Sequence, residues 1–334
     1  MDKLAYSLPT AKVLGAELGW LPGFHEYVRS ALGGGSCMPF FGAPGRFRYG
    51  VHLLIPSGSK VLVTYGVRDR KRQRYGVRVE CNPARMTASD IALIHNFFRD
   101  AFGEAYPELL RACRIRRLDV AVDLVGARLD DLHVIYSHAQ QLTVFGKRMS
   151  RTRGTIETLM FGSVSSSSAA AVYAKDVESL YRHVSKFSSS REQDDRLSDN
   201  RLQQLASRKS QPVVRVEVRL RKLDLLPSEL CALENRLLRF AFLERSSMSS
   251  VPPLTARAFW SMCRDIGLKA TMRSFDGHPF QDRLKESLSV RPSWWAPETA
   301  WEEALLSSVL RDLLTLSGVS GKALVDRRTR ERQA

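Results

Sequence analysis

The feature that most constrains this chain is a period-two alternation of apolar and charged residues in three separate stretches. The clearest is 117–124, where four apolar residues alternate with a second set that includes Asp119 and Asp123. The same alternation occupies 77–82 and 213–221. Successive side chains of a strand point to opposite faces, so each stretch predicts a strand with one apolar and one charged face. The sequence therefore predicts a sheet that is buried on one side.

Other segments extend this prediction to an α+β fold. Short β-rich runs between turn residues predict strands at 47–55, 60–65, 75–81, 114–124, 155–162, 170–175 and 213–220. Helical spacing of apolar residues predicts helices at 87–102, 129–139 and 176–187, and later at 230–242, 259–266 and 301–316. Residues 188–211 are polar and predict a loop or a solvated helix. We expect an antiparallel-sheet core with packed helices in residues 1–222 and a mainly helical C-terminal region in residues 223–334.

The charge balance indicates what kind of partner the chain has. Its 51 Lys and Arg residues against 35 Asp and Glu give a formal net charge of +16, which favours nucleic acid or an anionic membrane surface. A membrane-surface protein normally has a basic amphipathic helix, whereas the aromatic segment 294–301 is interrupted by proline and is not basic. No apolar run approaches the ~20 residues of a membrane span, and the start at Met1 lacks the layout of a secretion signal. We therefore expect a cytoplasmic protein without a membrane partner.

The five cysteines and seven histidines do not predict a metal or disulfide framework. No two cysteines are separated by two residues, and no two histidines flank a single apolar residue. Any divalent metal site must then depend on carboxylates, which suit Mg²⁺ or Mn²⁺ better than zinc. Asp119 and Asp123 are about 13 Å apart along their strand, so a ligand from another strand must complete such a site. For any one strand alone, a solvated outer face is the favoured explanation of the charged residues, and the recurrence of the pattern on several strands weakens it.

Tyr173 and Lys175 form a second candidate pair. On the predicted strand they share a face, which would let the ammonium lie near the phenol and favour its ionised form. A phenol with a pKa of about 10 needs such help to act as a nucleophile. The spacing of Tyr173 and Lys175 alone is equally compatible with a half-buried tyrosine that only packs against its neighbours.

Five motifs, read in order, resemble the replication initiation factor family. They are RVECNP at Arg78–Pro83, RRLDVAVDL at Arg116–Leu124, IETLMFGS at Ile156–Ser163, VYAKDVE at Val172–Glu178 and VRVEVRLR at Val214–Arg221. That family includes initiators of staphylococcal rolling-circle plasmids, replication proteins of filamentous phages and some relaxases of conjugative elements. No single motif is specific, but their shared order and spacing form a joint signal. The serine- and alanine-rich loop at 163–171 departs from the family pattern.

The resemblance implies a nicking-enzyme core that cuts and rejoins DNA through a 5′-phosphotyrosine and leaves a 3′-hydroxyl primer. It implies Tyr173 as the nucleophile, with Lys175 as its basic neighbour. It implies Glu80, Asp119 and Glu157 as ligands of Mg²⁺ or Mn²⁺, with Asp123 and Glu217 ranked behind them.

We predict DNA as the partner, either a single-stranded or a supercoiled origin, with backbone affinity from basic residues. These are Arg68, Arg70, Lys71, Arg72 and Arg74 in a turn and Arg215, Arg219 and Arg221 on a strand. A solvated loop explains the turn cluster equally well. Host helicase, host polymerase and a second copy of the chain are further candidate partners. A conjugative relaxase and a non-catalytic DNA-binding protein remain the alternative functions.

Overall fold

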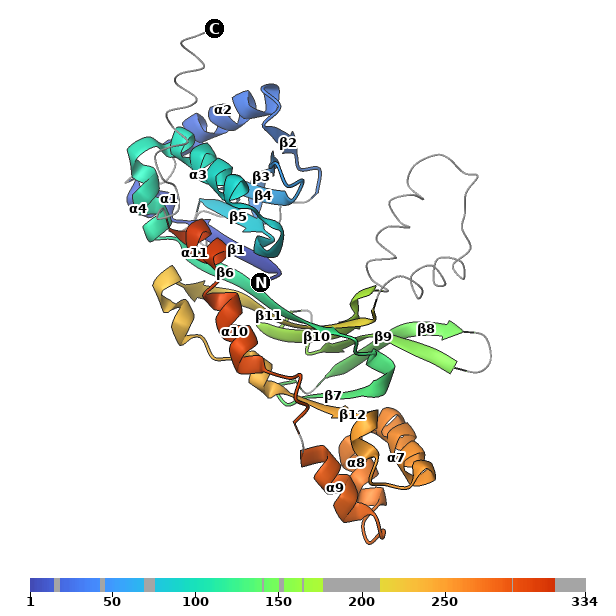
Figure 1. Ribbon diagram of the computed structural model, residues 1–334. Coiled ribbons are helices and arrows are strands. Elements are labelled where there is room, and N and C mark those ends of the chain that lie inside the picture. Colours follow the sequence, from blue (N-terminus) through green and yellow to red (C-terminus); the bar gives the residue numbers. More distant parts are fainter. Residues whose placement is uncertain are drawn as a thin grey trace, which may run out of the picture. The chain divides into compact units, whose positions relative to one another are not determined.

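A computed structural model describes residues 1–14, 19–42, 46–68, 76–139, 141–149, 153–163, 165–176, 211–289 and 291–315 (Figure 1). A large antiparallel sheet with helices confirms the predicted α+β class, and helices form much of the C-terminal part. The chain forms two compact units. Unit 1 consists of residues 1–120, 219–234 and 301–334, and unit 2 of residues 121–218 and 235–300. This division follows packing, so the predicted boundary after residue 222 stays a prediction.

Unit 1 contains strands in the order β2-β3-β4-β5-β1-β6, in which β1 lies between β5 and β6. These are β1 (Lys3–Leu8), β2 (Cys37–Pro39), β3 (Phe47–Leu54), β4 (Lys60–Val67), β5 (Val77–Cys81) and β6 (Arg114–Val125), which continues into unit 2. Its helices are α1 (Thr10–Val13), α2 (Trp20–Gly33), α3 (Ala88–Phe102), α4 (Tyr106–Arg111) and α11 (Ser308–Leu314), with the 3₁₀ turns η1 (Pro83–Arg85) and η2 (Gly103–Ala105). The strands predicted at 47–55, 60–65, 75–81 and 114–124 and the helix at 87–102 are present, whereas β1, β2, α1, α2 and α4 were not predicted.

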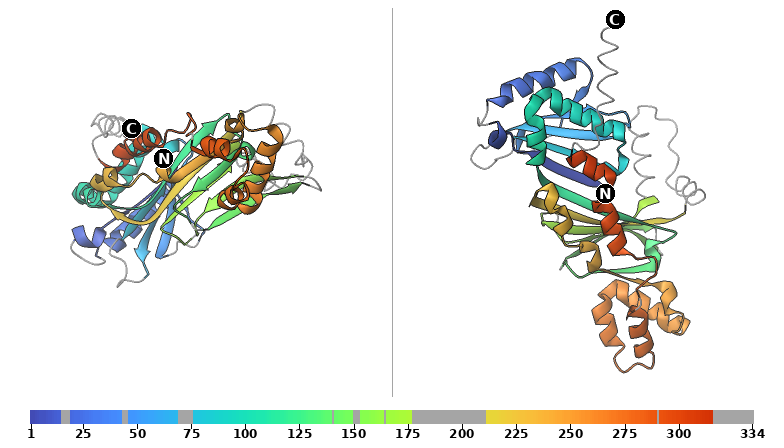
Figure 2. Two further views of the ribbon diagram at one scale, coloured as in Figure 1. Left: turned by 90° about the horizontal axis from the view of Figure 1, so that it is seen from below. Right: turned by 60° about the vertical axis from the view of Figure 1, so that its left-hand side comes forward.

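Helices cover one face of this sheet, as both views of unit 1 show (Figures 1 and 2). Phe24 of α2 stacks on Phe102 of α3 and contacts Tyr65 of β4 edge-to-face, with ring centroids 4.9 and 5.0 Å apart. Thr87 caps α3, because its side chain accepts from the Asp90 N–H while the Asp90 carboxylate accepts from the Thr87 N–H. The apolar side of each alternating strand therefore faces this helical layer, and the charged side faces away from it.

A buried histidine connects α11 to this layer. His95 of α3 is fully buried, and its Nε2 lies 2.7 Å from the backbone carbonyl oxygen of Asp312. Because a carbonyl can only accept, Nε2 carries the proton, and Nδ1 then accepts from the Tyr106 hydroxyl at 2.8 Å. Burial lowers the pKa of His95, so the neutral ring is favoured.

Unit 2 contains strands in the order β11-β10-β9-β8 and a separate pair, β12-β7. These are β7 (Leu132–Tyr136), β8 (Leu142–Met149), β9 (Arg153–Phe161), β10 (Ser168–Ala174), β11 (Val213–Leu225), which ends in unit 1, and β12 (Phe240–Glu244). Its helices are α7 (Pro253–Ile266), α8 (Leu268–Ser274) and α9 (Gln281–Ser289), and α10 (Pro297–Leu305) begins here. The 3₁₀ turns η3 (Leu129–Asp131), η5 (Arg236–Arg239) and η6 (Arg245–Met248) belong to unit 2, and η4 (Pro227–Ala232) to unit 1.

Two predicted helices were wrong. Residues 129–139 form η3 and strand β7, and residues 230–242 form 3₁₀ turns and the start of β12. The reason is pairing between the two segments, in which Tyr136 lies opposite Phe240 and Val134 opposite Phe242. All four side chains are buried, so cross-strand packing outweighs the local helical spacing. The predicted helix at 176–187 and the polar segment 188–211 lie outside the described residues except at their ends.

Among the described residues, no helix is long and apolar enough to span a membrane.

Candidate functional site

Tyr173 and Lys175 lie together in unit 2, although not as the sequence predicted. Strand β10 ends at Ala174, so Lys175 begins a helical turn instead of continuing the strand. Its ammonium lies 5.9 Å from the centroid of the Tyr173 ring, within the range of a cation–π contact. Tyr173 is only 8% exposed, while Lys175 is half-buried. A positive charge is therefore held beside a largely buried phenol.

Glu157 lies on β9 at a β-bulge beside this tyrosine. Thr158 pairs with Tyr173 on one side and Phe145 on the other, while Gly146 pairs with Ile156. Glu157 is thus the extra residue of β9 between these two pairs. Bulges redirect side chains and are frequent next to active sites. Glu157 therefore directly precedes Thr158, the residue that pairs with Tyr173 on the neighbouring strand.

Asp123 and Arg215 form a second charged group in unit 2. Arg215 donates Nε to Oδ1 and Nη2 to Oδ2 of Asp123, at 2.5 and 2.6 Å. Burial raises the pKa of Asp123, but the Arg215 hydrogen bond and charge, followed by the charge of Lys175, outweigh burial and lower it. Asp123 thus lies within electrostatic range of Lys175. Glu217 is 4% exposed on β11.

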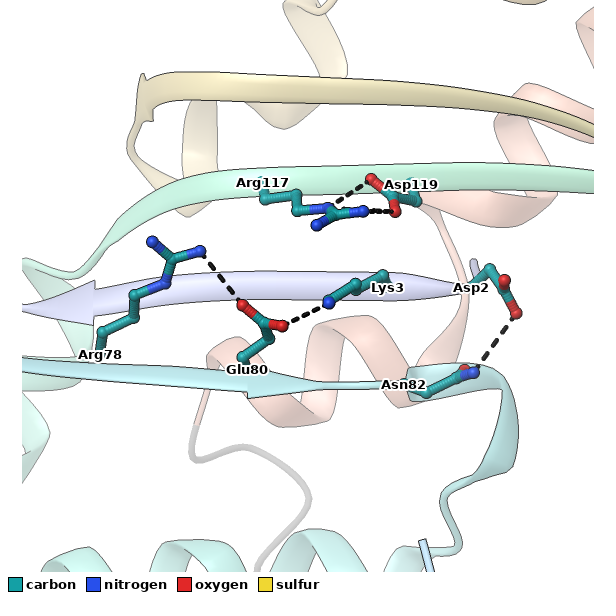
Figure 3. Close-up of polar contacts among 7 residues, drawn as sticks. All are labelled: Asp2, Lys3, Arg78, Glu80, Asn82, Arg117 and Asp119. Carbon is teal, nitrogen blue, oxygen red and sulfur yellow. Dashed lines mark hydrogen bonds and ion pairs between the residues drawn. The ribbon is translucent and has the colours of Figure 1, made fainter. Parts of the chain in front are cut away.

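Glu80 lies in unit 1 on the sheet face opposite the helices, in an ion-paired group (Figure 3). The Lys3 ammonium contacts Glu80 Oε1, and Arg78 Nη2 donates to Oε2 at 3.2 Å. Burial raises the pKa of Glu80, but the Lys3 hydrogen bond and charge, with the charges of Arg78 and Arg117, hold it below its usual value. Both carboxylate oxygens therefore have a basic partner.

Asp119 is held in a similar way two strands away on the same face. Arg117 donates Nε to both carboxylate oxygens of Asp119, at 2.9 and 3.1 Å, and Nη2 to Oδ2 at 2.5 Å (Figure 3). Asp119 is 1% exposed. Strand register sets this geometry, because Glu80, Ala5 and Arg117 form one row across β5, β1 and β6. The next row on this face places Lys3 opposite Asp119.

These carboxylates do not form a ready divalent-cation site in the described part of the chain. No three His, Cys, Asp or Glu side chains in the described ranges lie close enough together to hold a common ion. Oxygen donors of this kind suit Mg²⁺ or Mn²⁺, but Lys3, Arg78 and Arg117 already contact them. The present arrangement therefore fits internal ion pairing better than a bound metal.

The predicted DNA-binding residues fall into two sets. Arg70, Lys71, Arg72 and Arg74 lie outside the described residues. Arg68 lies within them and donates Nε to the carbonyl oxygen of Phe47 at 3.0 Å. On β11 the apolar residues of the alternating pattern are buried, whereas the basic residues Arg215, Arg219 and Arg221 are half-buried. Arg219 acts electrostatically on Arg117, so the basic side of β11 is near the Asp119 pair within unit 1.

Sequence reasoning missed two contributors, Lys3 and Arg117. Lys3 reaches Glu80 only because β1 inserts between β5 and β6, which local sequence does not show. For Arg117 a signal existed, since it stands two residues before Asp119 and so shares its strand face.

Comparison with solved structures finds weak similarity. No family model matches the chain, and no curated protein matches it. A solved structure described as a rolling circle replication initiator protein from Geobacillus stearothermophilus has 18% sequence identity, and the match covers 69% of this chain and 76% of that one. Its TM-score is 0.36, which is too low to establish a shared fold.

Proposed function

We propose that the protein cuts and rejoins DNA through Tyr173. The observation that carries this proposal is the pairing of a largely buried phenol with the Lys175 ammonium, beside the bulged Glu157. A nearby positive charge favours the phenolate, which is the attacking form of tyrosine. The net charge of +16 supports a polyanionic substrate.

In the proposed step the Tyr173 oxygen attacks a backbone phosphorus. A phosphorus–oxygen bond forms to the tyrosine and the bond to the 3′-oxygen breaks, so the 5′ end stays on the protein. The phenolic proton leaves to solvent or to a neighbouring carboxylate, and the 3′-oxygen takes up a proton. A returning 3′-hydroxyl reverses the step and joins the strand. In this role Lys175 acts on the phenol and does not itself change covalently.

The proposed biological role is initiation of rolling-circle replication for a phage or plasmid, with the released 3′-hydroxyl as primer. A conjugative relaxase uses the same chemistry at a transfer origin, so the adduct assay below supports either role. Dependence on Mg²⁺ or Mn²⁺ belongs to the proposal as a property to be measured. Because Glu80 and Asp119 are ion-paired, we assign no step to a metal.

The test is formation of a covalent protein–DNA adduct. Wild type, Tyr173→Phe and Tyr49→Phe would be incubated with labelled single-stranded and supercoiled DNA, with Mn²⁺, Mg²⁺ or chelator, and separated on denaturing gels. Tyr49 is a matched control, because it is a partly exposed strand tyrosine in unit 1. We expect adduct with wild type and Tyr49→Phe and none with Tyr173→Phe.

The other outcomes would contradict this assignment. An adduct with Tyr173→Phe would assign the nucleophile to another tyrosine, with Tyr181 the first to be replaced. DNA binding without any adduct, on several candidate origins and with every cation, would support the non-catalytic DNA-binding alternative.

A further inference from the structure

Phe145 lies in the same row of the sheet as Tyr173. Phe145 pairs with Thr158 of β9, and Thr158 pairs with Tyr173 of β10. Residues directly opposite each other on neighbouring strands point to the same face, so both rings project from one face of unit 2. Two strand spacings separate their backbones by about 10 Å.

Phe145 is exposed at the edge of the sheet of unit 2. On the inner strands both faces are buried, with Leu159, Phe161 and Val172 on one face and Ala171 and Tyr173 on the face that Phe145 shares. The Phe145 side chain is 54% exposed, because β8 is the edge strand. This ring therefore contributes little to the core and presents an aromatic surface beside Tyr173.

Basic residues occur farther along the same two strands. Lys147 and Arg148 follow Phe145 on β8, and Arg153 begins β9 opposite Met149. No acidic residue occurs on these two strands before Glu157. Positive charge combined with an exposed aromatic ring is the combination that binds single-stranded nucleic acid, through phosphate contacts and base stacking.

We infer that Phe145 stacks on an unpaired base of a DNA single strand, close to the nucleotide whose phosphate faces Tyr173. The placement of that phosphate rests on the proposed function, whereas stacking needs no cleavage. A duplex is a poorer occupant, because its base faces already stack on one another. Phe145 would thus fix the position of the strand relative to the nucleophile.

The test uses binding of a fluorescent oligothymidylate, measured by anisotropy, with Tyr173→Phe as the common background. Phe145→Ala, Phe145→Leu and Phe145→Trp would be compared with Phe41→Ala, since Phe41 is 92% exposed in unit 1 and lies on no strand of this row. Stacking contributes about 1–3 kcal/mol per base, so Phe145→Ala should lower affinity about 5- to 150-fold. Phe145→Leu should also lose most of the affinity that stacking provides, because leucine keeps the apolar area but has no ring to stack on a base.

Two further readouts separate stacking from other roles. We expect Phe145→Trp to retain affinity and its added fluorescence to be quenched by the oligonucleotide, while Phe41→Ala binds normally. Equal affinity for Phe145→Ala and Phe41→Ala would overturn the inference. So would a change in sedimentation of Phe145→Ala with unchanged DNA affinity, which would identify a second copy of the chain as the occupant. Since none of these measurements needs adduct formation, failure of the nicking proposal would be distinguishable.

Discussion

Replacing Arg117 by methionine tests how strongly the ion pair with Asp119 stabilises unit 1. Methionine keeps much of the apolar length but removes every donor. The Asp119 carboxylate, 2% exposed as a side chain, then loses all three hydrogen bonds from Arg117. Removing one partner of a buried pair costs about 3–5 kcal/mol, because the other charge stays buried and loses that counterion.

The expected loss lies at the lower end of that range. The Arg117 side chain is 22% exposed, so water reaches part of the site and weakens the pair. We expect the free energy of unfolding to fall by about 3 kcal/mol, roughly a hundredfold in the folding equilibrium. The double variant Arg117→Met/Asp119→Leu should recover much of this loss, because it leaves no buried charge at these two positions.

Urea unfolding followed by circular dichroism at neutral pH would measure these differences. Arg29→Met is the matched control, since Arg29 pairs with Glu26 while both side chains are mostly exposed at 66% and 73%. That variant should stay within about 0.5 kcal/mol of wild type. The reasoning fails if Arg117→Met is as stable as Arg29→Met, or if the double variant is less stable than Arg117→Met.

Three further changes test other contacts. Lys3 and Arg78 lower the pKa of Glu80 below 4.5, so the contribution of Glu80 to the free energy of unfolding is complete above that pH and disappears as pH falls through the folded pKa. Unfolding measured over an acid pH series should therefore show wild type losing stability relative to Glu80→Gln in that range. Parallel curves for the two proteins would contradict the pairing. Tyr106→Phe leaves His95 Nδ1 buried without a donor and should cost about 1–3 kcal/mol in urea unfolding, whereas an unchanged midpoint would exclude that bond. Thr87→Ala should cost about 1 kcal/mol and Thr87→Ser much less, and equal losses would argue against the α3 cap.

The sequence predicted those parts of the fold whose signal is local. The alternation that buries Leu118 and Val120, and the capped helix beginning after Thr87, need only neighbouring residues to be recognised. Strand β7 was missed because Leu132 to Tyr136 also has apolar residues at helical spacing, and its partner lies more than 100 residues later.

The candidate site shows the same limit. Tyr173, Lys175 and Glu157 were predicted from motifs, and the structure places them near each other in unit 2, while their roles stay predictions. The partners of Glu80 could not be found this way, because Lys3 reaches it across strands from distant parts of the chain. The proposed role of Phe145 likewise depends on strand register, because a one-residue slip would turn its side chain to the other face of the sheet.

Each unit is built from segments far apart in the chain, so folding of both units depends on residues that are synthesised late. A nascent chain ending at residue 222 lacks α11, whose Leu310, Leu313 and Leu314 are buried in unit 1, and lacks β12, which pairs with β7 in unit 2. Neither unit can therefore complete its core until the last third of the chain has left the ribosome. We expect the protein to finish folding after translation, and a chain cut at residue 222 to be degraded instead of folding on its own.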